Sequence, residues 1–210
     1  MKIRRILSWA LLTGGLVLLI SGSREFLSSI FNQAEIAEEW KPAVTAQSGE
    51  QQPPAAPGQP LAKMFVPRLN AELFVVEGTG KRELRRGPGH LEGTALPGTR
   101  GNCVIAGHRD THFRFLKDIR EGDEIFLDTS QGQFRYEVTK TEIVQPTNTA
   151  PLKSTPGAVL NLVTCYPFYY VGPAPKRFIV RAELATAVRT VKDMPGRPGT
   201  VGFPAISLTR

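Results

Sequence analysis

The sequence predicts a small all-β domain, either a closed barrel or a β-sandwich, carried behind an N-terminal membrane segment. About eight short candidate strands with turn residues between them follow Leu61. Helical periodicity is limited there to one short stretch, and the N-terminus of the chain is basic and then apolar. The chain has two cysteines, too few for a disulfide framework; a single disulfide between Cys103 and Cys165 is conceivable in an oxidising compartment, but it would consume the thiol of Cys165.

The N-terminal segment, residues 1–23, is predicted to be a single-pass membrane anchor. Three of its first five residues are basic, and residues 6–20 form an uncharged, mostly apolar run. This run is about the shortest that can span a bilayer as a helix. Basic residues favour the cytoplasmic side, so we expect the remainder of the chain outside the cell membrane. A cleaved secretory signal ending at residues 21–23 is the alternative, and it exports the same domain.

The next two segments are expected to connect this anchor to the folded domain. Residues 24–41 carry apolar side chains at helical spacing, which predicts an amphipathic helix on the membrane surface. Residues 42–60 mix Gln, Pro, Ala, Gly and Ser without periodicity, which is typical of a flexible linker. We therefore expect a tethered domain at residues 61–185 and a loose C-terminal tail at residues 186–210.

Within the domain, alternation of apolar and polar residues identifies the strands. It is clearest at residues 134–138 and again from Phe178 to Leu184. The strands are expected at residues 62–67, 73–77, 102–106, 124–128, 134–139, 141–144, 159–163 and 177–184. One short helix is predicted at residues 113–120.

The charge pattern excludes some classes of function. The net charge is +7, but basic residues are scattered among acidic ones and form no dense run with interleaved aromatics, so nucleic acid is not an expected partner. A basic surface suits an anionic membrane or cell wall. No glycine-rich phosphate loop follows a strand, which leaves nucleotide binding without support.

Cys165 is the strongest candidate for a chemical role. It ends the apolar run 160–164 and precedes Tyr166 and Pro167. A strand that ends in a cysteine can hold a nucleophile rigidly, while the following loop shapes a substrate groove. A thiol that cleaves an amide needs an acid for the leaving amine, and a histidine suits this task near neutral pH.

His108 is the candidate for that acid, because it follows a buried-looking strand. Gly107 is expected to let the backbone turn there and to leave room beside the ring. The carbonyl oxygen also needs a positive charge as it becomes negative, and arginine suits this role. Of Lys176, Arg177 and Arg181, geometry favours Arg177, because it opens the last strand one loop after the cysteine.

Other reactive side chains receive structural interpretations. His90 is expected to order a loop, and Cys103 to be a small buried residue in a strand. His112 follows His108 at the spacing of a zinc pair, but neither a glutamate between them nor a third ligand supports a metal site. Asp110 either steers Arg109 or His108, or is a solvated loop carboxylate.

The chain resembles the sortases, and most closely the class D sortases. The resemblance spans residues 61–184. It is carried by residues 77–79, 87–90, 93–94, 96–98, 102–111, 119–123, 162–168 and 176–180. It implies a closed eight-stranded β-barrel with one or two short helices and a cysteine transpeptidase activity. The motif matches place the nucleophile at Cys165, the acid and base at His108, and the oxyanion-stabilising arginine at Arg177.

The resemblance also implies the partners of the reaction. The enzyme would cleave a Leu-Pro-x-Thr-type sorting motif of a secreted protein after its Thr, through a thioester. It would then join the protein to an amine, either on a peptidoglycan stem peptide or on a protein lysine. Thr164, Tyr166 and Pro167 are expected to line the substrate groove. No metal or organic cofactor is needed, and we expect a monomer.

Two alternatives remain at this stage. A thiol protease would hydrolyse the same thioester with water, and nothing in the residues separates the two outcomes. A non-catalytic wall-binding barrel on a membrane tether is the second alternative. The combination of cysteine, histidine and arginine argues against it, because a binding module has no need of the three together.

Overall fold

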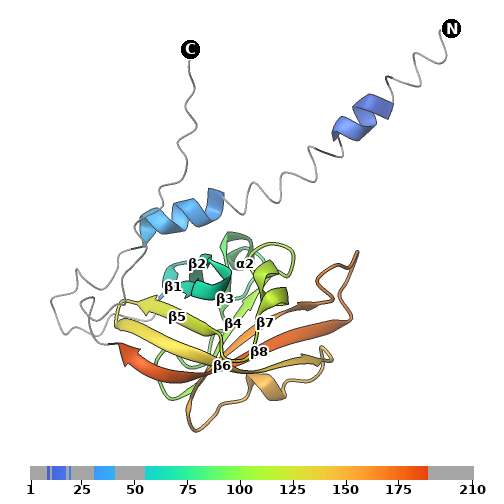
Figure 1. Cartoon of the computed structure of the whole chain (residues 1–210). Coiled ribbons are helices and arrows are strands. Elements are labelled where there is room, and N and C mark those ends of the chain that lie inside the picture. Colours follow the sequence, from blue (N-terminus) through green and yellow to red (C-terminus); the bar gives the residue numbers. More distant parts are fainter. Residues whose placement is uncertain (1–8, 10, 18, 20–30, 41–54, 189–210) are drawn as a thin grey trace.

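The computed structural model describes residues 9, 11–17, 19, 31–40 and 55–188 of the 210-residue chain. Its strands are β1 (Pro60–Val66), β2 (Ala71–Glu77), β3 (Gly89–His90), β4 (Gly101–Gly107), β5 (Glu124–Thr129), β6 (Gly132–Val144), β7 (Ala158–Tyr166) and β8 (Lys176–Val188). They close into a barrel in the order β1-β2-β3-β4-β7-β8-β6-β5 (Figure 1). The expected closed eight-stranded β-barrel is therefore confirmed, and the sandwich is excluded.

Three elements differ from the sequence prediction. The two strands expected at 134–139 and 141–144 are one long strand, β6, and an irregularity in its register with β8 between Val138 and Lys140 interrupts the alternation. The two-residue strand β3 was not predicted, because a Gly-His pair carries no periodicity. The helix expected at 113–120 is the 3-10 helix η3 (Arg114–Asp118).

Short helical turns join several of the strands. They are η2 (Pro67–Leu69), α2 (Glu83–Arg86) and η4 (Ala150–Leu152). The barrel interior is filled by apolar side chains from alternating strand positions, as in β5, where Ile125 and Leu127 are fully buried and their neighbours are partly exposed. The core also includes Tyr136, whose hydroxyl accepts a hydrogen bond of 2.7 Å from the backbone N–H of Gly98.

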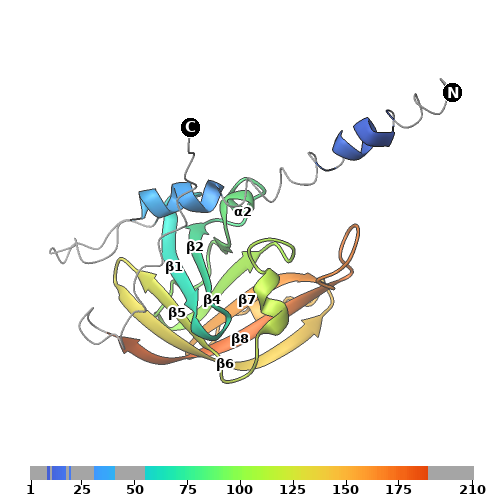
Figure 2. The ribbon, with the colours of Figure 1, turned by 45° about the horizontal axis from the view of Figure 1, so that its top comes forward.

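A helix at residues 31–39 packs on the barrel beside β2 and α2 (Figures 1 and 2). Ile36 on this helix is fully buried. The Gln33 amide pairs with the edge of β2: its Oε1 accepts from Phe74 N at 2.8 Å, and its Nε2 donates to Phe74 O at 3.2 Å. Gln33 Nε2 also lies 2.9 Å from Arg86 O. The side chain thus covers a stretch of β2 that β3 is too short to pair.

The segment predicted as a membrane-surface helix, residues 24–41, is thereby placed in part. Among its described residues, 31–40, Ile36 is buried and Trp40 lies 6.4 Å from the Phe74 ring, whereas Phe31, Ala34 and Ala37 are exposed. An ion pair of 3.0 Å between Glu39 and Arg86 adds to the contact. The side of the helix that packs on the barrel, with Ile36, is therefore not the apolar side that the helical spacing of Phe31, Ala34 and Ala37 predicts.

Much of the remaining prediction lies outside the described residues. This holds for most of the anchor at 1–23, for positions 42–54 of the linker, and for the tail from 189 onward. In the described part of the chain, no helix has both the length and the apolar character needed to cross a bilayer.

A charged pair ties η2 to the turn before β5. Two nitrogens of the Arg68 guanidinium donate hydrogen bonds to the Asp123 carboxylate: Nε to Oδ1, and Nη2 to Oδ2 at 2.6 Å. The backbone N–H of Arg120 donates to the same carboxylate at 2.7 Å. Asp123 is buried, so its charge depends on these partners. They lower the pKa of Asp123, chiefly through the hydrogen bonds from Arg68.

We expect Asp123→Asn to destabilise the fold by about 1 kcal/mol at pH 7, because the buried carboxylate loses its charge-assisted hydrogen bonds while the partly exposed guanidinium of Arg68 remains screened by solvent. The folded-state pKa lies below the unfolded value of about 3.9, so the pair stabilises the fold above that value. Its contribution is lost as the pH falls through the folded-state pKa. Urea unfolding of both proteins at decreasing pH measures this, and their stabilities should converge in acid. Glu121→Gln, which removes an exposed carboxylate from the same turn, is the control; equal effects of the two variants would contradict the prediction.

Candidate active site

Cys165 and His108 are brought together by two parallel strands. β4 and β7 are neighbours in the barrel, and their last paired residues are Gly107 and Thr164. His108 is the next residue after β4, and Cys165 is the next residue along β7. The Thr164 hydroxyl donates to the Gly107 carbonyl at 2.7 Å, which fixes the two strand ends to each other just before the reactive side chains.

Arg177 lies beside Cys165 on the next strand. β7 and β8 are antiparallel, and Cys165 is paired directly with Arg177. Side chains of directly paired residues project from the same face of a sheet, with Cβ atoms about 4.5–5.5 Å apart. Arg181 is paired with Asn161 instead, about 13 Å farther along the strand. The register therefore supports Arg177 over Arg181 as the arginine next to the thiol.

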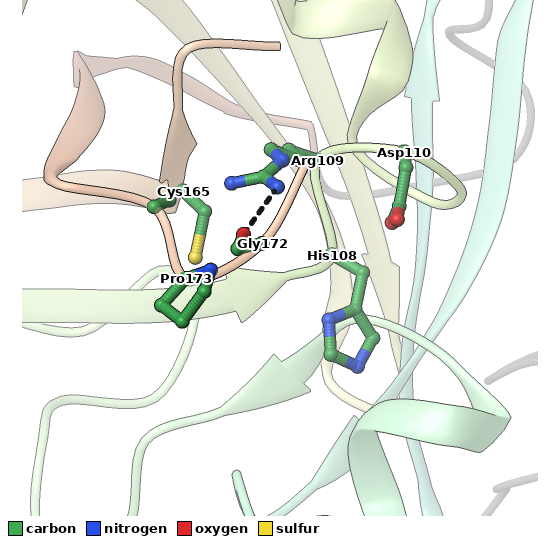
Figure 3. A pocket seen from close by; sticks show the side chains of 7 residues that line it. His108, Arg109, Asp110, Cys165, Gly172 and Pro173 are labelled. Atoms are coloured by element: carbon green, nitrogen blue, oxygen red, sulfur yellow. Dashed lines mark hydrogen bonds between the residues drawn. The ribbon is translucent and has the colours of Figure 1, made fainter. Parts of the chain in front are cut away.

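A cavity of about 210 Å³ opens at this point (Figure 3). It is lined by His108, Arg109, Asp110, Cys165, Gly172, Pro173 and Ala174. Cys165 is a half-buried free thiol, and the side chain of His108 is exposed. In this view the thiol of Cys165 and the ring of His108 lie on different sides of the cavity, with the chain at Gly172 and Pro173 near the thiol.

Arg177 does not line this cavity. Its Nη1 donates to the carbonyls of Ala174 and Lys176, at 3.3 and 3.0 Å. The guanidinium is thus held by two backbone carbonyls just before it, one in the β7–β8 loop and one at the first residue of β8. To bond a substrate oxygen, the guanidinium must give up at least one of these hydrogen bonds. Both carbonyls belong to residues at most three positions before Arg177 in the chain.

The three residues expected to line the substrate groove do not line this cavity either. Thr164 is only 2% exposed, because the period-2 alternation of β7 turns it to the same side as the buried Leu162. Its hydroxyl is used by Gly107, so Thr164 positions the strand ends; the expectation that it lines the groove is corrected. Tyr166 stacks on Phe178 at 6.3 Å, and Pro167 follows it at the start of the loop.

Gly107 serves a different purpose from the one predicted. A Cβ atom at this position would lie 2.7 Å from the ring of Phe113. Phe113 is fully buried in the core next to η3. The glycine therefore makes room for Phe113, while the backbone continues in β4 up to Gly107. The sequence analysis expected a glycine to be needed at this position, but for a turn of the backbone and for space beside the His108 ring.

The other two histidines are buried. His90 Nδ1 lies 2.8 Å from Glu77 Oε2, and its Nε2 is near Thr94 and Ala95. Burial, together with the nearby charge of His108, lowers the pKa of His112 to about 4. His112 is therefore neutral at physiological pH. Among the residues that the structure describes, no three metal-binding side chains gather at one place.

The second cysteine is separate from the site. Cys103 is 1% exposed and free, in agreement with the prediction of a small buried residue. Burial raises its pKa strongly, so it carries little thiolate at neutral pH. Any thiolate chemistry of the folded chain is therefore that of Cys165.

Arg109 is the residue that the sequence reasoning missed. Its Nη2 donates to the carbonyls of Tyr170 and Gly172, at 2.8 and 3.2 Å. One of these bonds is the dashed line in Figure 3. Asp110 also lines the cavity. The only sequence signal for Arg109 is its position directly after His108.

Comparisons with known proteins agree with this geometry. A family model described as the Sortase domain matches residues 64–185. The chain is 42% identical to Sortase D of Bacillus subtilis (strain 168) over 130 residues, which is 61% of this chain and 66% of that protein. It is 33% identical to Sortase SrtE1 of Streptomyces coelicolor over 130 residues, covering 53% of this chain and 37% of that protein. The chain thus spans less than two thirds of the length of these relatives.

Solved structures with the same fold include two from these groups. A Clostridium perfringens Sortase D5 transpeptidase superposes with a TM-score of 0.62 at 26% identity, covering 76% of this chain and 99% of the other. Sortase E1 from Streptomyces coelicolor, solved with a tripeptide in the active site, gives a TM-score of 0.60 at 29% identity. It covers 67% of this chain and 97% of the other.

Proposed function

Because this chain belongs to the sortase family, we propose that it is a class D-type cysteine transpeptidase that uses Cys165, His108 and Arg177. The observation that carries the proposal is the strand register. Cys165 is paired with Arg177 across β7 and β8, and His108 emerges beside it at the end of β4. The similarity to Sortase D of Bacillus subtilis supports the class.

The first half of the reaction forms a thioester. The Cys165 thiolate attacks the carbonyl carbon of Thr in a Leu-Pro-x-Thr-type motif, and the carbonyl oxygen becomes negative. Arg177 stabilises this oxygen by charge and hydrogen bonding. The C–N bond then breaks, and His108 gives a proton to the departing amine.

The second half transfers the acyl group. An amine of the acceptor attacks the thioester carbonyl, and His108 takes the proton that the amine releases. The C–S bond breaks, which returns Cys165 as a thiolate and leaves a new amide. The acceptor amine belongs to a peptidoglycan stem peptide or to a protein lysine. No oxidant or reductant is needed, because each new bond is formed by the lone pair of the attacking thiolate or amine.

The site of action that we propose is the outer face of the cell membrane. The apolar run at residues 6–20 with its basic lead supports an anchor at residues 1–23. The helix at 31–39 packs on the barrel, so it connects the folded domain to the segment next to the anchor.

Mass spectrometry of the full chain, purified in detergent, tests the activity. The chain is incubated with Leu-Pro-x-Thr-x peptides, with and without diaminopimelate- or glycine-type amines. We expect an acyl adduct on Cys165 that passes to the amine. An adduct released only to water would favour a thiol protease. If no peptide forms an adduct on Cys165 although a thiol-alkylating reagent does, the result would favour the non-catalytic barrel.

A further inference from the structure

The loop between β7 and β8, residues 167–175, forms one wall of the cavity that contains Cys165. Gly172, Pro173 and Ala174 of this loop line the cavity. Its tip is exposed, and Val171 is 99% accessible. A cavity of about 210 Å³ is smaller than the sites of roughly 300–1,000 Å³ that hold ordinary ligands. In this position the loop limits the space beside the thiol that a peptide could occupy.

Arg109 holds the inner part of the loop. Its guanidinium donates to the carbonyls of Tyr170 and Gly172, and it also lies over the Tyr170 ring, 5.8 Å from the centroid. A planar guanidinium can bond two acceptors and stack on a ring at the same time, whereas an ammonium group cannot. Among the described residues, no carboxylate forms an ion pair with Arg109, so the loop is its main partner.

A second contact holds the outer part of the loop on η3. The Tyr169 ring lies 5.9 Å from the cationic groups of both Arg114 and Lys117. Hydrogen bonds from Lys117 and then from Arg114 lower the pKa of the Tyr169 phenol. Because the Tyr169 side chain is 71% exposed, water and salt weaken these contacts. Contacts of this exposed kind cost little to replace, so a ligand can displace them.

We propose that Arg109 is a positioning residue that latches the β7–β8 loop beside Cys165, and that release of this latch admits the peptide and the acceptor amine. Tyr169, on Arg114 and Lys117, forms the outer half of the latch. The part that concerns peptide and amine rests on the proposed function, whereas the control of access to the thiol does not.

Alkylation of Cys165 by a bulky maleimide dye tests the latch without any substrate. The rate is measured from pH 5 to 9, with mass spectrometry to locate the adduct, and the buried Cys103 does not compete. The midpoint of the pH profile reports how readily the thiol ionises, and the high-pH plateau reports access. Arg109→Gln should raise the plateau by about fivefold or more, because the closed loop becomes less populated.

Tyr169→Ser gives an independent variant, since it loosens the loop without changing the charge next to the thiol. It should raise the plateau about twofold and leave the midpoint in place. Arg109→Lys should behave more like Arg109→Gln than like the unchanged chain, because the fork is lost while the charge is kept. Arg100→Gln is the matched control, an exposed arginine just before β4 and about 20 Å from the site along that strand.

The outcomes separate the latch from simpler explanations. A shifted midpoint with an unchanged plateau in Arg109→Gln would reduce Arg109 to an electrostatic partner of the thiol and overturn the latch. An unchanged plateau in both Arg109→Gln and Tyr169→Ser would overturn it as well. If Arg109→Gln does not fold, as judged by its unfolding midpoint, the result for Tyr169→Ser decides alone.

Transfer kinetics then test the link to the reaction. With a reactive peptide, Arg109→Gln should lower KM and change kcat less, because the loop is open to the peptide in a larger share of the molecules. Equal KM values would overturn the role in substrate access. Faster alkylation in a chain that forms no acyl adduct with any peptide would instead refute the proposed function and leave the latch intact.

Discussion

Cys165→Ala should abolish acyl transfer, with a loss of at least about 10³-fold in rate, because alanine offers no nucleophile. The intact-mass adduct with a Leu-Pro-x-Thr-x peptide should disappear completely. The fold should persist, since Cys165 is half-buried at a strand end and the barrel core lies on the other side of β7. The thermal midpoint should therefore stay within about 2 °C of the unchanged chain.

Cys103→Ala is the matched control for this experiment. It removes the other thiol of the chain, from a residue that is 1% exposed in the core. We expect a lower unfolding midpoint, because the substitution leaves a small cavity, together with an undiminished acyl adduct in the folded protein. Peptide transfer by Cys165→Ala, or loss of the adduct in folded Cys103→Ala, would move the nucleophile away from Cys165.

The proposed active-site geometry could be predicted from the sequence because it depends on where two strands end. The apolar runs that end near His108 and Cys165 are short and continuous, so their position along the chain is well defined. The strands that carry His108 and Cys165 are far apart in the chain, and it was the resemblance that implied that these residues act together. The register of β4, β7 and β8 agrees with this. The side that each residue faces was harder to predict, and Thr164 was assigned to the groove although alternation turns it inward.

Contacts between distant segments were the least predictable. The bond from Arg109 to Tyr170 joins residues 61 positions apart, and neither residue forms part of a periodic pattern. The pairing of Gln33 with Phe74 likewise depends on an open stretch of β2, which appears only when β3 is seen to be two residues long. The helical spacing of Phe31, Ala34 and Ala37 did not identify Ile36 as the buried contact of this segment, because those three residues are exposed and Ile36 lies outside the pattern.

Arg177→Lys should lower the rate of acyl-adduct formation at saturating peptide by about 10²-fold or more, although the positive charge is retained. The Arg177 guanidinium now donates to the backbone carbonyls of Ala174 and Lys176, and this forked group can direct one donor to an oxyanion while another keeps its backbone partner. A single ammonium group loses this arrangement. Single-turnover formation of the acyl adduct, measured at saturating peptide, isolates the chemical step from peptide binding.

Arg181→Lys is the control for this substitution, because Arg181 lies on the same strand and is paired with Asn161 rather than with Cys165. It should retain nearly full activity, which would show that charge conservation on β8 is tolerated away from the thiol. Unimpaired adduct formation by Arg177→Lys would transfer the oxyanion role to another cation. Arg109 would then be the first candidate, because it lines the cavity with Cys165 whereas Arg177 reaches it only from the neighbouring strand.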